Sequence, residues 1–290
     1  MVSNFVVKVP ATSANLGPGF DSMGLAVNKF LTVEASVSDA YSIEMLQEEL
    51  NVLPLDETNL VLDTAIHTAR LFGKTLPKLN LVMDSEIPLS HGLGSSSSAI
   101  VAGIELANHF CSLELSEHDK VMLGCNIEGH PDNIGPCITG GIFVGYFEDG
   151  ELFYQTINDD GLRFIISVPH YEINTDEARK RLPAEYHKSV AVSQNALNNV
   201  MLMALVKGKY EDMGRLMMRD RFHEPFRQPL IREFNDIKDT AIENGAYATT
   251  ISGAGPSVLT VCSKENQDTI FESLKKIDGV IHERISLFNK

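Results

Sequence analysis

Residues 90–108 read SHGLGSSSSAIVAGIELAN, and this stretch decides how the fold is interpreted. Gly92 and Gly94 permit a tight turn and let a ligand approach the backbone closely. Four serines then lead into an apolar block that predicts a buried helix, which we expect the serine hydroxyls to cap. The free N–H groups and partial positive charge of such a helix start predict a phosphate site. A well-capped core helix is the alternative, and the P-loop pattern G-x-x-x-x-G-K-[ST] is not matched.

The composition excludes several classes of protein. The chain has 290 residues, of which 43% are hydrophobic and 22% charged, as expected for a globular protein with a core. Its 24 basic and 39 acidic residues give a net charge of −15, which argues against nucleic acid or an anionic membrane as partner. We see no secretory signal, and no run is expected to approach the roughly 18 apolar residues of a membrane span. With four cysteines in no C-x-x-C spacing, a cytoplasmic protein with reduced thiols is predicted.

Strands and helices are mixed along the chain without a regular βαβ repeat, which predicts an α+β fold. Strands are expected over residues 5–9, 30–37, 78–84, 140–147, 162–169, 247–251, 258–262 and 280–287. Helices are expected over residues 59–72, 117–127 and 264–277, with a helix-rich stretch over 175–244. Pro10 is expected to end the first strand, and Asp149-Gly150 predicts a hairpin turn. The predicted division is 1–155 and 156–290.

Two further loops resemble the serine stretch in their small and glycine-rich character. Residues 10–21 read PATSANLGPGFD and residues 251–258 read ISGAGPSV. With IEGHPDNIGP at 127–136, these stretches resemble the motifs of the GHMP kinase family in the form of its homoserine-phosphorylating members. Ser98 departs from that pattern, where alanine is more frequent.

The resemblance implies an N-terminal ribosomal-S5-like lobe and a C-terminal ferredoxin-like α/β lobe. It implies ATP-dependent phosphorylation of the side-chain hydroxyl of L-homoserine to O-phospho-L-homoserine and ADP, a step of threonine biosynthesis. The ATP phosphates would be bound by Pro88, Gly92, Leu93, Gly94, Ser95, Ser96, Ser97 and Ser98. Mg²⁺ would be held by Ser96 and Glu128, which are also the expected catalytic residues together with Asp21. A solvent-exposed carboxylate at a helix end is the alternative for Glu128.

The resemblance also implies a binding site for the amino-acid acceptor, formed by Asn15, Asp21, His130, Thr175, Arg179, Arg227 and Gly253. Asp21 suits the ammonium and the arginines suit the carboxylate, because a guanidinium binds both oxygens. Thr175 is also expected to cap a helix. Gly255 is expected to let the backbone pass close to substrate. We expect no strong side-chain base, although Asp21 paired with Lys8 is the alternative.

Three alternatives stay open at this point. The acceptor could be mevalonate or a sugar, as in other GHMP kinases, or the chain could be a non-catalytic ligand-binding relative.

A zinc site at Glu128, His130 and Asp132 is disfavoured, since ligands from a triplet interrupted by proline rarely converge on one ion. The expected partner is the small molecule L-homoserine, and a homodimer is an alternative to a single chain.

Overall fold

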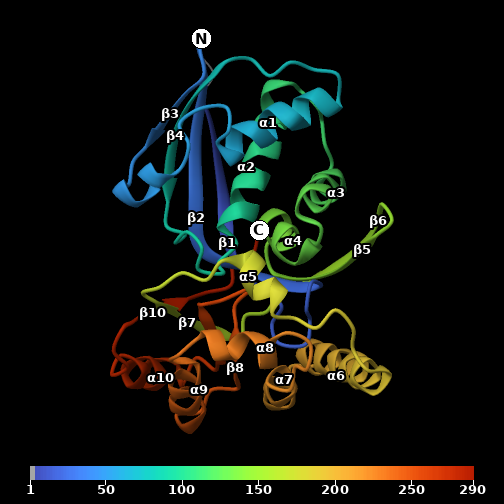
Figure 1. Cartoon of the computed structure of the whole chain (residues 1–290), viewed down its shortest axis with the longest axis vertical. Coiled ribbons are helices and arrows are strands. Elements are labelled where there is room, and N and C mark those ends of the chain that lie inside the picture. The colour runs from blue at the N-terminus through green and yellow to red at the C-terminus, as the bar shows by residue number, and fades with distance from the viewer. Residues whose placement is uncertain (1–3) are drawn as a thin grey trace.

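The computed structural model describes residues 4–290 and places two sheets in two lobes, one above the other in Figure 1. The strands of the N-terminal sheet are β1 (Phe5–Ala14), β2 (Met23–Val37), β3 (Ser42–Met45), β4 (Leu79–Ser85), β5 (Ile142–Glu148) and β6 (Glu151–Ile157). They lie in the order β3-β4-β2-β5-β6, and β1 pairs with β2. The elements beside this sheet are η1 (Glu48–Val52), α1 (Leu60–Leu71), α2 (Ser95–Phe110), α3 (Glu117–Glu128) and α4 (Pro131–Thr139). Helix α2 packs on β1 and β2 and is buried along most of its length.

The C-terminal lobe contains an antiparallel sheet of four strands. Its strands are β7 (Arg163–Pro169), β8 (Ala248–Ile251), β9 (Val258–Cys262) and β10 (Val280–Ile285), in the order β10-β7-β9-β8. Its helices are α5 (Thr175–Lys180), α6 (Lys188–Val206), α7 (Tyr210–Met217), α8 (Glu224–Arg227), η2 (Gln228–Leu230), α9 (Phe234–Glu243) and α10 (Gln267–Leu274). The strand order and the crossover helices are those of a ferredoxin-like lobe, as expected.

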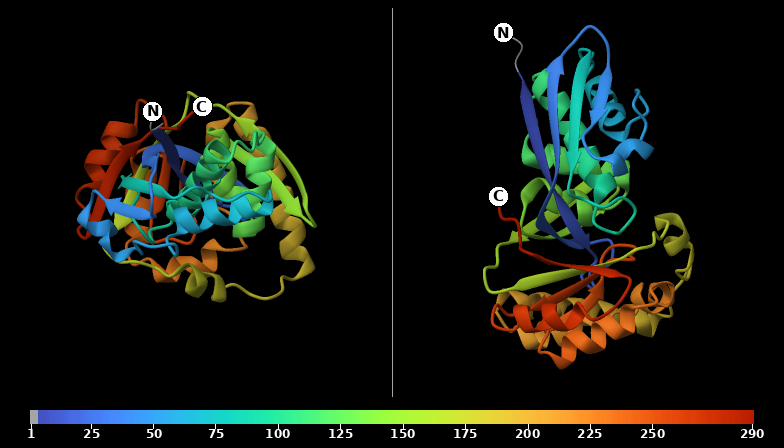
Figure 2. Two further views of the ribbon diagram at one scale, coloured as in Figure 1. Left: turned by 90° about the horizontal axis from the view of Figure 1, so that it is seen from above. Right: turned by 90° about the vertical axis from the view of Figure 1, so that its left-hand side faces the viewer.

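One apolar core runs through both lobes. It joins Leu25 and Phe143 of the N-terminal sheet to Phe164 and Leu205 of the C-terminal lobe. The C-terminus returns to the junction of the lobes (Figure 2), where isolated bridges join Val27 to Leu287 and Gly140 to Asn289. The division at 155/156 stays a prediction; β6 continues past it to Ile157.

The first strand was expected to end at Pro10, and this prediction is wrong. Strand β1 continues to Ala14, with a register shift between Pro10 and Ala11. Proline has no N–H for a strand ladder, and a bulge accommodates that loss. The continuation carries the chain from the N-terminal sheet to the loop that contains Asn15 and Asp21.

Helix α6 is long and apolar enough to cross a membrane by length and composition, so the expectation that no run approaches a membrane span is wrong. Only 22% of this apolar stretch is buried. A single helix of this kind is weak evidence, and α6 packs along α7 at the edge of the C-terminal lobe.

Candidate active site

The start of helix α2 is built from left-handed glycines. Gly94 is the N-cap, with φ 70°, and no side chain caps the helix, so the prediction of serine caps is wrong. A Cβ on Gly94 would lie 2.0 Å from Thr12 Oγ1, and one on Gly92 would lie 2.3 Å from the carbonyl oxygen of Ser252. Side chains at these two positions would therefore separate the turn at residues 92–94 from β1 and from the loop between β8 and β9 (residues 252–257), called the C-terminal loop below.

The serines of α2 divide into two groups. Ser95, Ser96 and Ser97 line a cavity, and Ser96 is the most exposed of them. Ser98 is fully buried, and its hydroxyl donates to the carbonyl oxygens of Pro10 at 3.1 Å and Gly94 at 2.9 Å. Ser98 thus braces the bulge of β1, and the structure does not bring it to the cavity as its assignment to ATP binding required.

The cavity has a volume of about 490 Å³ and is lined by residues of both lobes. It brings together all the other predicted site residues, namely Asn15, Asp21, Pro88, Gly92, Leu93, Gly94, Ser95, Ser96, Ser97, Glu128, His130, Thr175, Arg179, Arg227 and Gly253. It is also lined by residues outside that prediction, among them Val52, Leu53, Pro54, Thr58, Asn59, Leu60, Val61, His91, Asp132, Asn133 and Glu172. Gly255, which was expected to pass close to substrate, is not among the lining residues, and a Cβ there would lie 3.0 Å from Ile231 Cδ1.

Two acidic residues flank His130 on the N-terminal side of the cavity. Burial raises the pKa of Glu128, at the end of α3, against the opposing effect of the His130 charge. His130 Nδ1 lies 2.6 Å from Asp132 Oδ1. Burial alone would lower the pKa of His130, but its bond to Asp132 and the nearby carboxylates raise it to about 9. His130 is therefore a cation near neutral pH.

Ligand atoms of Asp21, His130 and Asp132 lie within 4.8 Å of one another. This cluster differs from the disfavoured zinc triplet, since it contains Asp21 in place of Glu128. Its carboxylates have cationic partners in the chain: Asp132 bonds His130, and Asp21 pairs with Arg179. The cluster is therefore a balanced network of charges.

The loop after β1 is tightly shaped. Asn15 and Asp21 both have positive φ, of 74° and 53°. The side chain of Asn15 spans the site, because its Oδ1 accepts from the Asp21 backbone at 3.1 Å and its Nδ2 donates to the Gly253 carbonyl at 2.9 Å. Asn15 thus fixes Asp21 relative to the C-terminal loop.

The two arginines enter the cavity from the C-terminal lobe. Arg227, in α8, is 3% exposed and donates from Nη1 to the Gly253 carbonyl at 3.0 Å. Burial lowers its pKa. Arg179, in the short helix α5, is half exposed and lies 2.8 Å from Asp21. Thr175 begins α5 but does not cap it: the cap is Asn174, whose side chain accepts from the backbone of residues 176 and 177.

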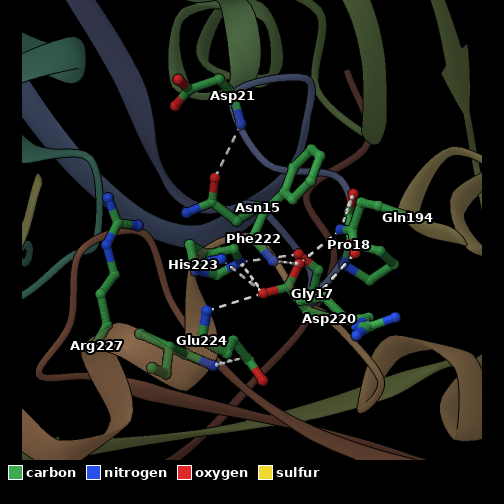
Figure 3. A network of polar contacts seen from close by, with 12 residues as sticks. Asn15, Gly17, Pro18, Asp21, Gln194, Asp220, Phe222, His223, Glu224 and Arg227 are labelled. Atoms are coloured by element: carbon green, nitrogen blue, oxygen red, sulfur yellow. Dashed lines mark hydrogen bonds and ion pairs between the residues drawn. The ribbon is translucent and has the colours of Figure 1, made fainter. Parts of the chain in front are cut away.

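A buried polar network supports the loop from below (Figure 3) and was not predicted. Asp220 accepts from the backbone N–H groups of residues 222, 223 and 224 and from Gln194 Nε2. Gln194 Nε2 also donates to the Pro18 carbonyl at 3.1 Å, and His223 Nε2 to the Gly17 carbonyl at 2.8 Å. These contacts join segments far apart in the chain, so no local pattern indicates them.

Family models match a segment of each lobe. Residues 59–141 match the N-terminal domain of GHMP kinases and residues 201–278 match their C-terminal domain. A homoserine kinase of Staphylococcus epidermidis is 40% identical over 97% of this chain and 94% of its own length. The crystal structure of homoserine kinase from Cytophaga hutchinsonii matches with a TM-score of 0.88 at 29% identity, covering 99% of this chain and 95% of that chain. A mevalonate kinase of Methanococcus jannaschii, at 18% identity and a TM-score of 0.76 over 99% of both chains, shares the fold.

Proposed function

This chain belongs to the homoserine kinases of the GHMP kinase family, and from that premise we propose that it transfers the γ-phosphoryl group of ATP to the side-chain hydroxyl of L-homoserine. The products are O-phospho-L-homoserine and ADP. We also propose a place in threonine biosynthesis and a cytoplasmic location, in keeping with its four free cysteines.

One observation carries the proposal for the site. The amino end of α2 opens into the same cavity as Asp21, Arg179 and Arg227. Free backbone N–H groups and serine hydroxyls suit the phosphates of ATP. A carboxylate and two guanidinium groups suit an acceptor that carries both an ammonium and a carboxylate. Mevalonate has no ammonium and a sugar has neither charge, so this set of side chains favours an amino-acid acceptor.

The residues present fit a magnesium ion. Mg²⁺ prefers oxygen ligands and is usually held by one or two protein groups together with phosphates. Glu128 and Ser96 both line the cavity, and among residues 4–290 no lysine or arginine forms an ion pair with Glu128. We propose that Glu128 and Ser96 hold the ion. When bound, Mg²⁺ neutralises charge on the phosphates during transfer.

The remaining lining residues divide the cavity between its two substrates. We propose that the apolar residues Val52, Leu53, Pro54 and Val61 receive the adenine. Asn15, His130, Thr175 and Gly253 would surround the acceptor. Arg227 would bind its carboxylate with Arg179, and Asp21 would bind its ammonium.

We propose direct attack by the alcohol oxygen on the γ-phosphorus. The O–P bond to the acceptor forms as the bond to ADP breaks, and the alcohol proton passes late to a phosphoryl oxygen. A loose transition state needs little activation of the nucleophile. Lys8, the alternative partner of Asp21 in base catalysis, does not line the cavity: its Nζ lies 4.0 Å from the centre of the Phe30 ring.

The test is ADP release from Mg·ATP with L-homoserine, L-serine, L-threonine, mevalonate and galactose as separate acceptors. We expect strong turnover with L-homoserine alone. Turnover that favours mevalonate or galactose would overturn the acceptor assignment. Failure of folded protein to turn over any acceptor would favour a ligand-binding relative without catalysis.

A further inference from the structure

Phe20 contacts both arginines of the site, although it does not itself line the cavity. The Cζ atom of Arg227 lies 5.3 Å from the centre of the Phe20 ring, and that of Arg179 lies 5.8 Å from it. Both distances are within the roughly 6 Å at which an aromatic ring attracts a cation. Because the ring is absent from the cavity wall, any effect of Phe20 on a bound acceptor must pass through the arginines.

The arginines have few other groups that fix their orientation. Arg227 is buried, yet its Nε has no hydrogen-bond partner among residues 4–290, and its Nη1 bonds only the Gly253 carbonyl. Arg179 lies on a helix of six residues, with a side chain 47% exposed, and pairs with Asp21. The two like charges also repel. The electron-rich face of an aromatic ring offsets such repulsion, since it attracts both guanidinium groups.

The ring of Phe20 is held in turn by the buried network of the C-terminal lobe. The His223 imidazole stacks on it, with ring centres 5.3 Å apart and planes at 20°. His223 is itself fixed, because its Nε2 donates to the Gly17 carbonyl and its backbone N–H donates to Asp220 (Figure 3). Nε2 thus carries the proton in this neutral ring, whose pKa burial lowers. The position of Phe20 is therefore determined by a buried side chain that does not line the cavity.

We propose that Phe20 is a positioning residue for the acceptor's carboxylate, because its ring orients the guanidinium groups of Arg227 and Arg179. The inference rests on the proposed function and extends it. It assigns part of the selectivity for carboxylate-bearing acceptors to a residue that the acceptor does not touch. A purely structural role would instead affect every substrate equally.

The test compares F20L with F20Y, using L-homoserine and 3-aminopropan-1-ol, which lacks the carboxylate. For F20L we expect KM for L-homoserine to rise about tenfold, the size of a pair of cation–π contacts. KM for ATP should stay within about twofold, and kcat within about threefold, of wild type. With 3-aminopropan-1-ol as acceptor, kcat/KM of F20L should equal that of wild type. F20Y keeps the ring face and should match wild type with both acceptors.

An equal loss of kcat/KM with both acceptors, or a rise in KM for ATP of the same size, would show that Phe20 only packs the loop. If F20L does not fold, F20M provides the same comparison with a flexible side chain of similar volume. The proposed function is judged separately, by turnover of L-homoserine by the wild-type protein. Its failure would appear there, before any variant is compared.

Discussion

Asp21 is the residue on which the mechanism and the acceptor assignment both depend. Its carboxylate lies 2.8 Å from Arg179, and its backbone is fixed by Asn15. If Asp21 binds the acceptor's ammonium, D21N should raise KM for L-homoserine at least about tenfold and lower kcat less than about fivefold. The reason is that the lost charge-assisted contact stabilises the bound substrate and the transition state equally. Steady-state kinetics with each substrate varied in turn will measure both effects.

If D21N instead affected kcat far more than KM, Asp21 would be identified as the base. In that case kcat would fall steeply with little change in KM, and the late proton transfer proposed above would be wrong. D176N is a matched control: Asp176 is an exposed aspartate in α5, the helix of Arg179, and does not line the cavity. Its kinetic constants should equal those of wild type.

At the scale of elements, helix α8 is joined to strand β8 by a buried carboxyl group. Glu224 is 8% exposed, and its side chain accepts from the Ile251 backbone N–H at 2.6 Å. Burial raises the pKa of Glu224 to about 8, from 4.5. Between these two pH values the folded chain holds a proton that the unfolded chain has released. The free energy of unfolding should therefore fall as pH rises through this window, by at most about 1.4 kcal/mol for each pH unit.

The variant E224Q tests this pH dependence. Glutamine still offers an oxygen to Ile251 but does not ionise, so E224Q should unfold at a higher temperature than wild type at pH 8.5. At pH 5, where Glu224 is protonated, the two should differ little. Thermal unfolding at half-unit steps of pH will show the difference, with the exposed E243Q as control. Parallel curves for wild type and E224Q would contradict a raised pKa.

Local patterns predicted the elements whose side chains repeat regularly. In β4, alternate residues are apolar and face the core, namely Leu79, Leu81 and Met83. The β5–β6 hairpin turns at Asp149-Gly150, where both residues have positive φ. Helix α4 was not predicted, because Pro131 in the sequence indicates an interruption of helical structure. In the structure Pro131 is the first residue of the helix, a position that favours proline. The passage of β1 through Pro10 was missed because a bulge depends on the partner strand.

The sequence predicted the loops that line the candidate site, but not the buried polar network that holds those loops in place. The three glycine-rich stretches are local motifs, and fifteen of the sixteen proposed site residues line one cavity. Asp220, Gln194 and His223 carry no such signal, since their partners lie far away in the chain. Ser98 shows the converse: a motif position can face the core while its neighbours face the cavity.

At the scale of the whole molecule, the lobes share both a core and a site. The apolar cluster that includes Phe143 and Phe164 is continuous. Hydrogen bonds from the Gly253 backbone to Ala14 and from Thr12 to Leu93 join the C-terminal loop, β1 and the turn at residues 92–94. Opening the lobes would expose this core and separate the residues that we propose bind the two substrates. We therefore expect the chain to unfold as one cooperative unit.

Tryptophan probes can test this, because the chain contains no tryptophan. Tyr154 stacks on Phe143 in the N-terminal lobe, and Tyr247 contacts Tyr210 in the C-terminal lobe. The fluorescence midpoints of Y154W and Y247W in urea should coincide with each variant's own midpoint by circular dichroism. A non-hydrolysable ATP analogue with Mg²⁺ should raise both midpoints together, since binding to one folded state stabilises all of it. A midpoint in one lobe that precedes the circular dichroism transition, or that alone responds to the analogue, would show that the lobes unfold independently.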